Sequence, residues 1–244
     1  MKNIIPTKTQ LRSSQWVFLV LAGLACAVFL IAAPSLMARV VMLPGDAVRG
    51  ALLANNAVPD TDLQKWAATR RRALHWRAMA EVLDDLALAS LTQAGREKAD
   101  SKEAKDQWRD AIQWQRRALA RAPSDTFGWA RLAYMITQTE GLTDEAAATL
   151  THSFDTGPYE PALALIRLNM AVLMLDKLDP DVNTSLSFMI RAAWNDDPRG
   201  LVRSASENHF ISLAEKALAD DPEKLENFRE KLSAMDENEK HQKD

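Results

Sequence analysis

Residue types that commonly carry enzyme chemistry are sparse and scattered in this sequence. Its four histidines lie at positions 75, 152, 209 and 241, without HExxH spacing and with no two inside one helical turn. Cys26 is the only cysteine, which excludes a zinc or iron–sulfur site built from cysteines. The chain has no glycine-rich phosphate loop and no GxSxG motif. We therefore expect a protein that is not an enzyme and has no cofactor or metal.

Adjacent carboxylates are the next candidates for chemistry. They occur as Asp84-Asp85, Asp196-Asp197 and Asp220-Asp221, and the last two pairs are each followed by a proline. An aspartate before a proline is typical of a helix start, where the carboxylate caps free backbone N–H groups. Capping explains these two pairs without catalysis.

Two arginine runs are candidate binding residues for an anionic partner: Arg70, Arg71 and Arg72 in the first, and Arg116 and Arg117 in the second. Guanidinium groups bind carboxylates and phosphates in a bidentate manner, so an acidic peptide or anionic polymer would suit them. The alternative is a solvated helix face paired with nearby acids. Nucleic acid is not expected, because the chain beyond residue 43 has 26 basic and 33 acidic residues.

An apolar segment near the N-terminus predicts a membrane anchor. Residues 16–38 contain no charge, and this stretch exceeds the roughly 20 apolar residues that a spanning helix needs. A cleavable signal peptide is an alternative, but the apolar run is too long for one and its small residues around Cys26 lie mid-segment. A lipoprotein signal is a second alternative, but this sequence lacks the leucine that such a signal has three positions before its cysteine.

Flanking charges predict the orientation of this anchor. Residues 1–15 contain three cations and no acid, whereas Arg39 and Arg49 beyond the segment are offset by Asp46. Cationic flanks stay in the cytoplasm, so residues 1–15 are expected inside and the body in the periplasm of a bacterial inner membrane. The N-terminal flank has only one cation more than the flank beyond the segment.

The rest of the chain is expected to be all-α, because strong helix formers dominate it and no window alternates like a strand. Residues 44–222 form the expected helical domain, and residues 223–244 a charged, frayed C-terminal tail. The expected helices cover residues 60–74, 77–94, 105–121, 125–139, 143–154, 161–178 and 180–194, with two more after Asp197-Pro198 and Asp221-Pro222.

Prolines recur at these helix ends with a small residue five positions earlier, as in Ala118/Pro123 and Ser153/Pro158. The prolines at 123, 158, 198 and 222 are 24 to 40 residues apart, a spacing typical of helical-hairpin solenoids. With these residues the sequence resembles a tetratricopeptide repeat (TPR) protein. Its best unit covers Thr126 to about Pro158. The positions that match the family pattern are Ala111, Gln115, Ala118, Pro123, Trp129, Leu132, Ala133, Ile136, Ala146, Leu150, Ser153 and Pro158.

Residues 157–193 are richer in apolar side chains than the rest of the body. Arg167 lies inside this stretch, and we expect Asp176 or Asp179 to pair with it. With its Gly-Pro turn and Arg167-Leu168 pair, the stretch also resembles single-pass inner-membrane proteins of bacterial exopolysaccharide clusters. That resemblance implies an accessory role in polysaccharide assembly or export through protein contacts.

The expected function is therefore a membrane-anchored, TPR-like scaffold of cell-envelope biogenesis. Two alternatives stay open. One is an anchor subunit that is recognised through its transmembrane helix. The other is a cytoplasm-facing TPR adaptor, similar to that of lipopolysaccharide assembly, although that family ends in a CxxC metal module that this chain lacks.

Overall fold

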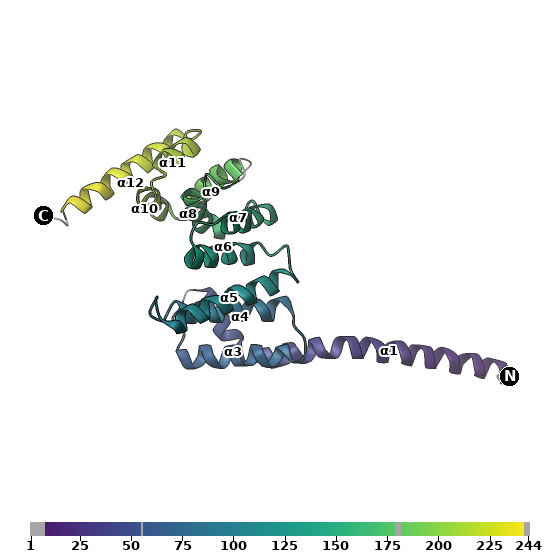
Figure 1. The fold of residues 1–244 in the computed structure, drawn as a ribbon. Helices are drawn as coiled ribbons and strands as arrows, with labels where there is room; N and C mark the ends of the chain where they lie inside the picture. Colours follow the sequence, from purple (N-terminus) through teal and green to yellow (C-terminus); the bar gives the residue numbers. More distant parts are fainter. Residues whose placement is uncertain (1–7, 55, 179–181, 242–244) are drawn as a thin grey trace. The chain divides into compact units, whose positions relative to one another are not determined.

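The computed structural model describes residues 8–54, 56–178 and 182–241, and in these ranges the chain is helical with no strand (Figure 1). This confirms the expected all-α class. The chain divides into two compact units, Met1–Ala89 and Ser90–Asp244.

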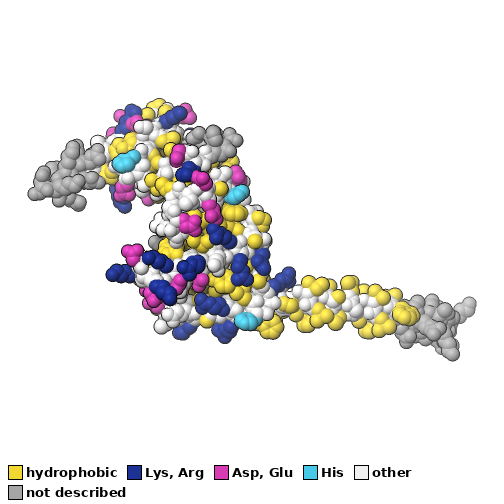
Figure 2. Space-filling model, in the orientation of Figure 1, with side chains coloured by type: hydrophobic (Ala, Val, Ile, Leu, Met, Phe, Trp, Pro, Cys, Tyr) yellow, Lys and Arg dark blue, Asp and Glu magenta, His cyan; other side chains and the backbone are white. Residues whose placement is uncertain are grey.

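The first helix, α1 (Lys8–Met42), contains the predicted anchor and extends it on both sides. The apolar helix counted from Trp16 is the one helix within the described ranges that is long and apolar enough to cross a membrane. None of its most apolar 18-residue window is buried, so α1 is not a core helix of this chain. Figure 2 shows the hydrophobic side chains on one face of this exposed helix. Pro34 lies within the helix near its C-terminal end.

Unit 1 continues from α1 without a flexible linker. A short 3-10 turn, η1 (Leu43–Gly45), leads directly into α2 (Asp46–Leu53), and α3 (Asp60–Leu74) and α4 (Ala80–Ala94) follow. Its helix α3 packs along α1 and buries Ala38 and Met42. Its small apolar core consists of Val58, Leu63, Trp66, Ala67 and Ala89.

Unit 2 is a succession of helices: α5 (Lys102–Leu119), α6 (Thr126–Glu140), α7 (Asp144–Thr156), η2 (Pro161–Leu163), α8 (Ala164–Leu173), α9 (Val182–Asp196), α10 (Pro198–Glu207), α11 (Ile211–Leu218) and α12 (Pro222–His241). Local caps begin several of them. Asp125, Thr143 and Asp197 each accept a hydrogen bond from the backbone N–H three residues later. Asp221 caps α12 in the same way, so capping is confirmed for Asp197 and Asp221.

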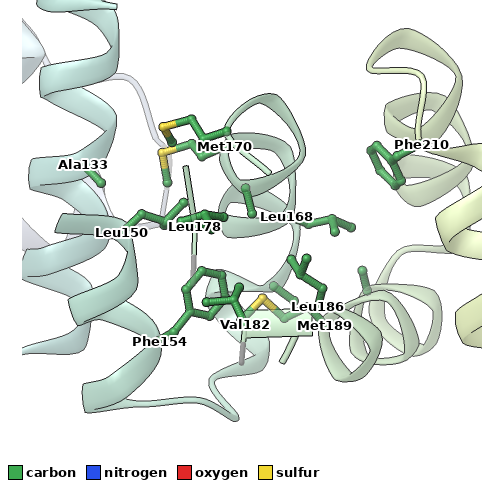
Figure 3. Close-up of a cluster of buried hydrophobic side chains, with 14 of the residues drawn as sticks. Ala133, Leu150, Phe154, Leu168, Met170, Leu178, Val182, Leu186, Met189 and Phe210 are labelled. Atoms are coloured by element: carbon green, nitrogen blue, oxygen red, sulfur yellow. The ribbon is translucent and has the colours of Figure 1, made fainter. Parts of the chain in front are cut away.

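One continuous apolar core runs through unit 2. Figure 3 shows part of it, where Leu150 and Phe154 of α7 extend toward Leu178 and Val182. In the most closely packed pair, α6 and α7, small side chains lie at the contact: Ala133 and Ala146 are fully buried. Such residues let helix axes approach closely, as the sequence pattern predicted for residues 126–158.

Several bounds differ from the sequence expectations. Helix α4 begins at Ala80 and not at residue 77, α5 covers residues 102–119 and not 105–121, and the sequence predicts neither α2 nor α11. The helix expected over 161–178 is shorter, because α8 ends at Leu173 and turns follow it. The helix expected after Asp221-Pro222 is α12, but it is not only solvated, because its Phe228 is 0% exposed and stacks edge-on against Trp194. Leu225, Leu232 and Met235 also pack against the core, so an apolar face attaches this highly charged helix to unit 2. The expected cap Asp179-Pro180 lies outside the described residues.

Candidate functional site

Arg70, expected to be available to an anionic partner, is buried inside unit 1. Its side chain is 0% exposed, and its Nε donates to Oδ2 of Asp85 at 2.8 Å. Its Nη1 donates to the carbonyl oxygen of Met42 at 2.7 Å, and its Nη2 donates to Asp46 at 3.1 Å. The guanidinium is thus fully used within the chain, and the expectation for Arg70 is wrong.

A second cation completes this buried cluster. Arg49 of α2 donates from Nε to Oδ1 of Asp85 at 2.8 Å, so each carboxylate oxygen of Asp85 has its own guanidinium partner. Burial raises the pKa of Asp85, and the two arginines act in the opposite direction. Burial alone would lower the pKa of Arg49, but the pairing with Asp85 raises it. The opposite charges of the arginines offset part of the cost of burying this carboxylate.

Close packing surrounds the same cluster. The Arg70 guanidinium lies over the Trp66 ring, 5.2 Å from its centroid. Gly45 approaches both side chains so closely that a Cβ there would lie 2.5 Å from Arg70 Nη1 and from Trp66 Cδ1. The cluster therefore joins the end of α1, through Met42, η1 and α2, to α3 and α4. We call Arg49, Arg70, Asp46 and Asp85 the anchor lock.

The remaining arginines of the two runs lie on the surface. Arg71 and Arg72 are exposed on α3 in unit 1. In unit 2, Arg116 forms an ion pair with Glu145 at 2.5 Å, and Arg117 lies over the Trp114 ring at 4.6 Å from its centroid. The two runs belong to different units, and Arg116 and Arg117 already have partners in their own unit.

A groove in unit 2 is the best-formed candidate binding site. It has a volume of about 710 Å³ and lies between α5, the connection before it and the C-terminal end of α6. Trp108 and Ile112 supply apolar surface, and Trp108 also contacts Tyr134 with ring centroids 6.3 Å apart. The lining residues are Ala99, Asp100, Lys105, Trp108, Arg109, Ile112, Gln113, Arg116, Gln138, Thr139 and Glu140.

Charged side chains that line the groove form ion pairs within the chain. Arg109 bonds Asp106 at 2.8 Å, and Lys105 lies 3.9 Å from Asp100. These pairs are exposed, so each is worth about 1 kcal/mol or less and a ligand carboxylate can replace the internal partner. The arrangement suits an acidic segment that also presents an apolar side chain.

The TPR-motif residues have a structural role around α5, α6 and α7. Most are buried, namely Ala111, Gln115, Ala118, Leu132, Ala133, Ile136, Ala146, Leu150 and Ser153. Trp129 is only partly buried and donates from Nε1 to the carbonyl oxygen of Pro123 at 2.7 Å. Pro158 is half-buried next to Gly157. They hold the helices that form the groove wall and do not line the groove.

Arg167 is a second buried arginine, and its partners differ from those expected. Its Nη2 donates to the Ser153 carbonyl oxygen at 2.6 Å, and its Nη1 donates to the Gly157 carbonyl oxygen at 2.7 Å. The C-terminal end of α7 thus takes the place of Asp176, because unpaired carbonyls at a helix end carry partial negative charge. Burial lowers the pKa of Arg167 to about 10. Asp179 lies outside the described residues.

Sequence reasoning missed the groove and most of the anchor lock. Trp108 and Ile112 are four residues apart on one helix, with Lys105 and Arg109 interleaved, so a signal for a face was present. Nothing local indicated that the end of α6 would form the opposite wall. In the sequence Asp85 is recognisable only as half of the Asp84-Asp85 pair, and nothing nearby indicates that it binds Arg70 and Arg49.

Comparison with known proteins adds no assignment to this geometry. Among the residues that the structure describes, no group of three or more His, Cys, Asp or Glu side chains is arranged to hold a metal ion. No protein-family model matches the sequence, and no curated protein matches it.

Proposed function

We propose that this protein is a non-enzymatic, membrane-anchored adaptor that binds a protein partner in the groove between α5 and α6. The groove is the observation that carries the proposal, since apolar side chains (Trp108, Ile112) and charged side chains line it together. Helical walls of this kind accommodate extended segments or helices of other proteins. The groove chemistry favours an acidic segment with at least one large apolar residue.

The anchor supports this proposal by keeping the body close to a bilayer. Residues 16–38 of α1 span the membrane, and the anchor lock joins the end of α1 to α3 and α4. Because this junction has no flexible linker, unit 1 stays near the membrane surface. We place it in the bacterial inner membrane, as a TPR-like scaffold of cell-envelope biogenesis. The link to exopolysaccharide assembly or export rests on the sequence resemblance alone.

Site-specific photocrosslinking tests the proposal. A photoreactive amino acid at Gln113, which lines the groove, should capture a membrane-complex partner in cells, and Trp108→Ala should reduce that capture. The matched control places the same amino acid at Ala148, an exposed position on α7 outside the groove. Equal capture from both positions, or no envelope-biogenesis protein among the products of Gln113, would contradict the proposal.

Exposed α1 supports a second candidate, an anchor subunit recognised through its transmembrane helix. The side chains of α1 over residues 16–32 are all exposed, and α3 covers part of the helix only farther along, at Ala38 and Met42. Replacing residues 16–30 with an unrelated apolar helix separates the two candidates, because this change leaves the contacts near Ile31 and beyond intact. The adaptor proposal expects retained function, whereas the anchor-subunit alternative expects loss.

For topology we propose that the N-terminus is cytoplasmic and the body periplasmic, following the three cations of residues 1–15. A single cysteine at the exposed Ala219, in a Cys26→Ser background, gives the test. An impermeant thiol reagent should label it once the outer membrane is opened. Protection until the inner membrane is also lysed would support the cytoplasm-facing adaptor instead.

A further inference from the structure

One surface of unit 1 lies beside the apolar end of α1. Arg77, just after α3, donates from Nη1 to the Ser35 hydroxyl at 2.5 Å, and the same nitrogen lies 3.5 Å from the Ile31 carbonyl oxygen. Both acceptors belong to the uncharged segment of α1, residues 16–38. The segment after α3 is therefore held at the level where the spanning segment ends.

The pairing of α3 with α1 gives the depth of neighbouring residues. Arg70 of α3 donates to the Met42 carbonyl oxygen, and Arg77, three residues after the end of α3, donates to Ser35. The chain from α3 to Arg77 thus runs antiparallel to α1, and the two acceptors are seven residues apart on α1. At 1.5 Å per residue, the two contacts lie about 10 Å apart along α1. The headgroup layer on one side of a bilayer is about 5–7 Å thick. Arg77 thus lies at the start of this layer, and the anchor lock lies just beyond it.

Side chains at this level have the chemistry of a membrane interface. Trp76, next to Arg77, is 49% exposed, and tryptophan concentrates at the boundary between hydrocarbon and headgroups. Arg77 is exposed at the same level, and Arg71 and Arg72, next to Arg70 on α3, are exposed near the outer edge of the headgroup layer. Residues 63–80 contain five Lys and Arg residues and no acid. Arg39 on α1 pairs with Glu81 at 3.3 Å, so its charge is already compensated.

We propose that Arg71, Arg72, Trp76 and Arg77 form a surface that binds the anionic phospholipid headgroups of the leaflet where α1 leaves the bilayer. The arginines bind phosphate groups, and Trp76 inserts its ring among the headgroups. The inference rests on the spanning role of α1, which is part of the proposed function. It goes beyond that function, because it gives the exposed arginines of the first run a lipid ligand instead of a protein.

Reconstitution into vesicles tests the proposal with the full chain. His75→Cys in a Cys26→Ser background carries a fluorophore, and lipids with a headgroup spin label quench it when the surface meets the bilayer. Phosphatidylglycerol is titrated into phosphatidylcholine vesicles at fixed salt. Quenching should rise with the phosphatidylglycerol content, and added salt should weaken this response.

Matched variants identify the arginines as the cause. Arg71→Gln, Arg72→Gln and Arg77→Gln together should raise the phosphatidylglycerol content needed for half-maximal quenching by about tenfold or more. The same three positions changed to Lys should retain the response, since their charge is kept. The control removes three cations from unit 2 through Arg199→Gln, Arg203→Gln and Lys231→Gln, and it should behave as the parent.

The outcomes are distinguishable. A phosphatidylglycerol response that survives the triple Gln variant, or quenching that never occurs although the protein floats with the vesicles, would overturn the headgroup proposal and leave the anchor intact. Protein that fails to float with vesicles of either composition would overturn the spanning role of α1 and the inference with it.

Discussion

Removing the carboxylate of the anchor lock should strongly destabilise unit 1. Asp85→Asn has nearly the same shape, but it leaves the fully buried Arg70 facing a neutral amide where an ionised oxygen had accepted its hydrogen bond at 2.8 Å. Breaking a buried ion pair by removing one partner costs about 3–5 kcal/mol. Since 1.4 kcal/mol corresponds to a factor of ten, local opening should become more frequent by about two to three and a half orders of magnitude.

Hydrogen exchange of the full chain in lipid nanodiscs measures this opening directly. Peptides from α3 and α4 should exchange faster by that factor in Asp85→Asn, or lose protection entirely, whereas α6 and α7 in unit 2 should exchange as in the parent. Glu81→Gln, which removes the exposed pair with Arg39 from the same helix, is the matched control and should cost about 1 kcal/mol or less.

A double variant separates an uncompensated charge from general damage to packing. Arg70→Met with Asp85→Leu fills the site with apolar groups, and such replacements of a buried pair are often neutral or stabilising. Protection of α3 should therefore recover relative to Asp85→Asn. The reasoning is refuted if Asp85→Asn exchanges no faster than Glu81→Gln, or if the double variant is no more protected than Asp85→Asn.

Three further predictions concern close packing, the C-terminal helix and pH. Gly45→Ala should speed exchange of α3, because its Cβ would lie 2.5 Å from Arg70 and Trp66, whereas Gly50→Ala, with open space around it, should not. Phe228→Ala should cost about 3–5 kcal/mol and release α12 to limited proteolysis, in contrast to truncation after Met235, which removes no residue of the packed contact. The hydrogen bond that the Lys224 backbone N–H donates to Asp221 lowers the pKa of this carboxylate. The ionised cap therefore stabilises α12 fully at pH values above the ordinary Asp pKa of about 4. This stabilisation is lost as the pH falls through the lower pKa that Asp221 has in the folded protein. Asp221→Ser should keep the cap without this dependence on acid. The measurement is the hydrogen-exchange protection of α12, corrected for the intrinsic exchange rate, at a series of pH values. The same loss of protection at low pH in both proteins would contradict the prediction.

Local features of this protein were readable from the sequence because their causes act over a few residues. The uncharged run of residues 16–38 was sufficient to predict α1, since helix length and apolar composition suffice to define a candidate span. Asp197 and Asp221 cap their helices through a backbone N–H only three residues away. The small residues Ala133 and Ala146 are buried in α6 and α7, two helices that pack together and are joined by a short loop.

Tertiary structure decided which charged residues are buried, because burial depends on partners far along the chain. Arg70 looked like its exposed neighbours Arg71 and Arg72, yet its partners Asp85, Asp46 and Met42 are 15, 24 and 28 residues away. Arg167 donates hydrogen bonds to carbonyl oxygens at the C-terminal end of α7, because packing brings that helix end beside it. Moving a solvated carboxylate into the core would instead require the free energy of desolvating it. Composition therefore determined the all-α class and the candidate membrane span, and the three-dimensional contacts determined which arginines join helices and which remain on the surface.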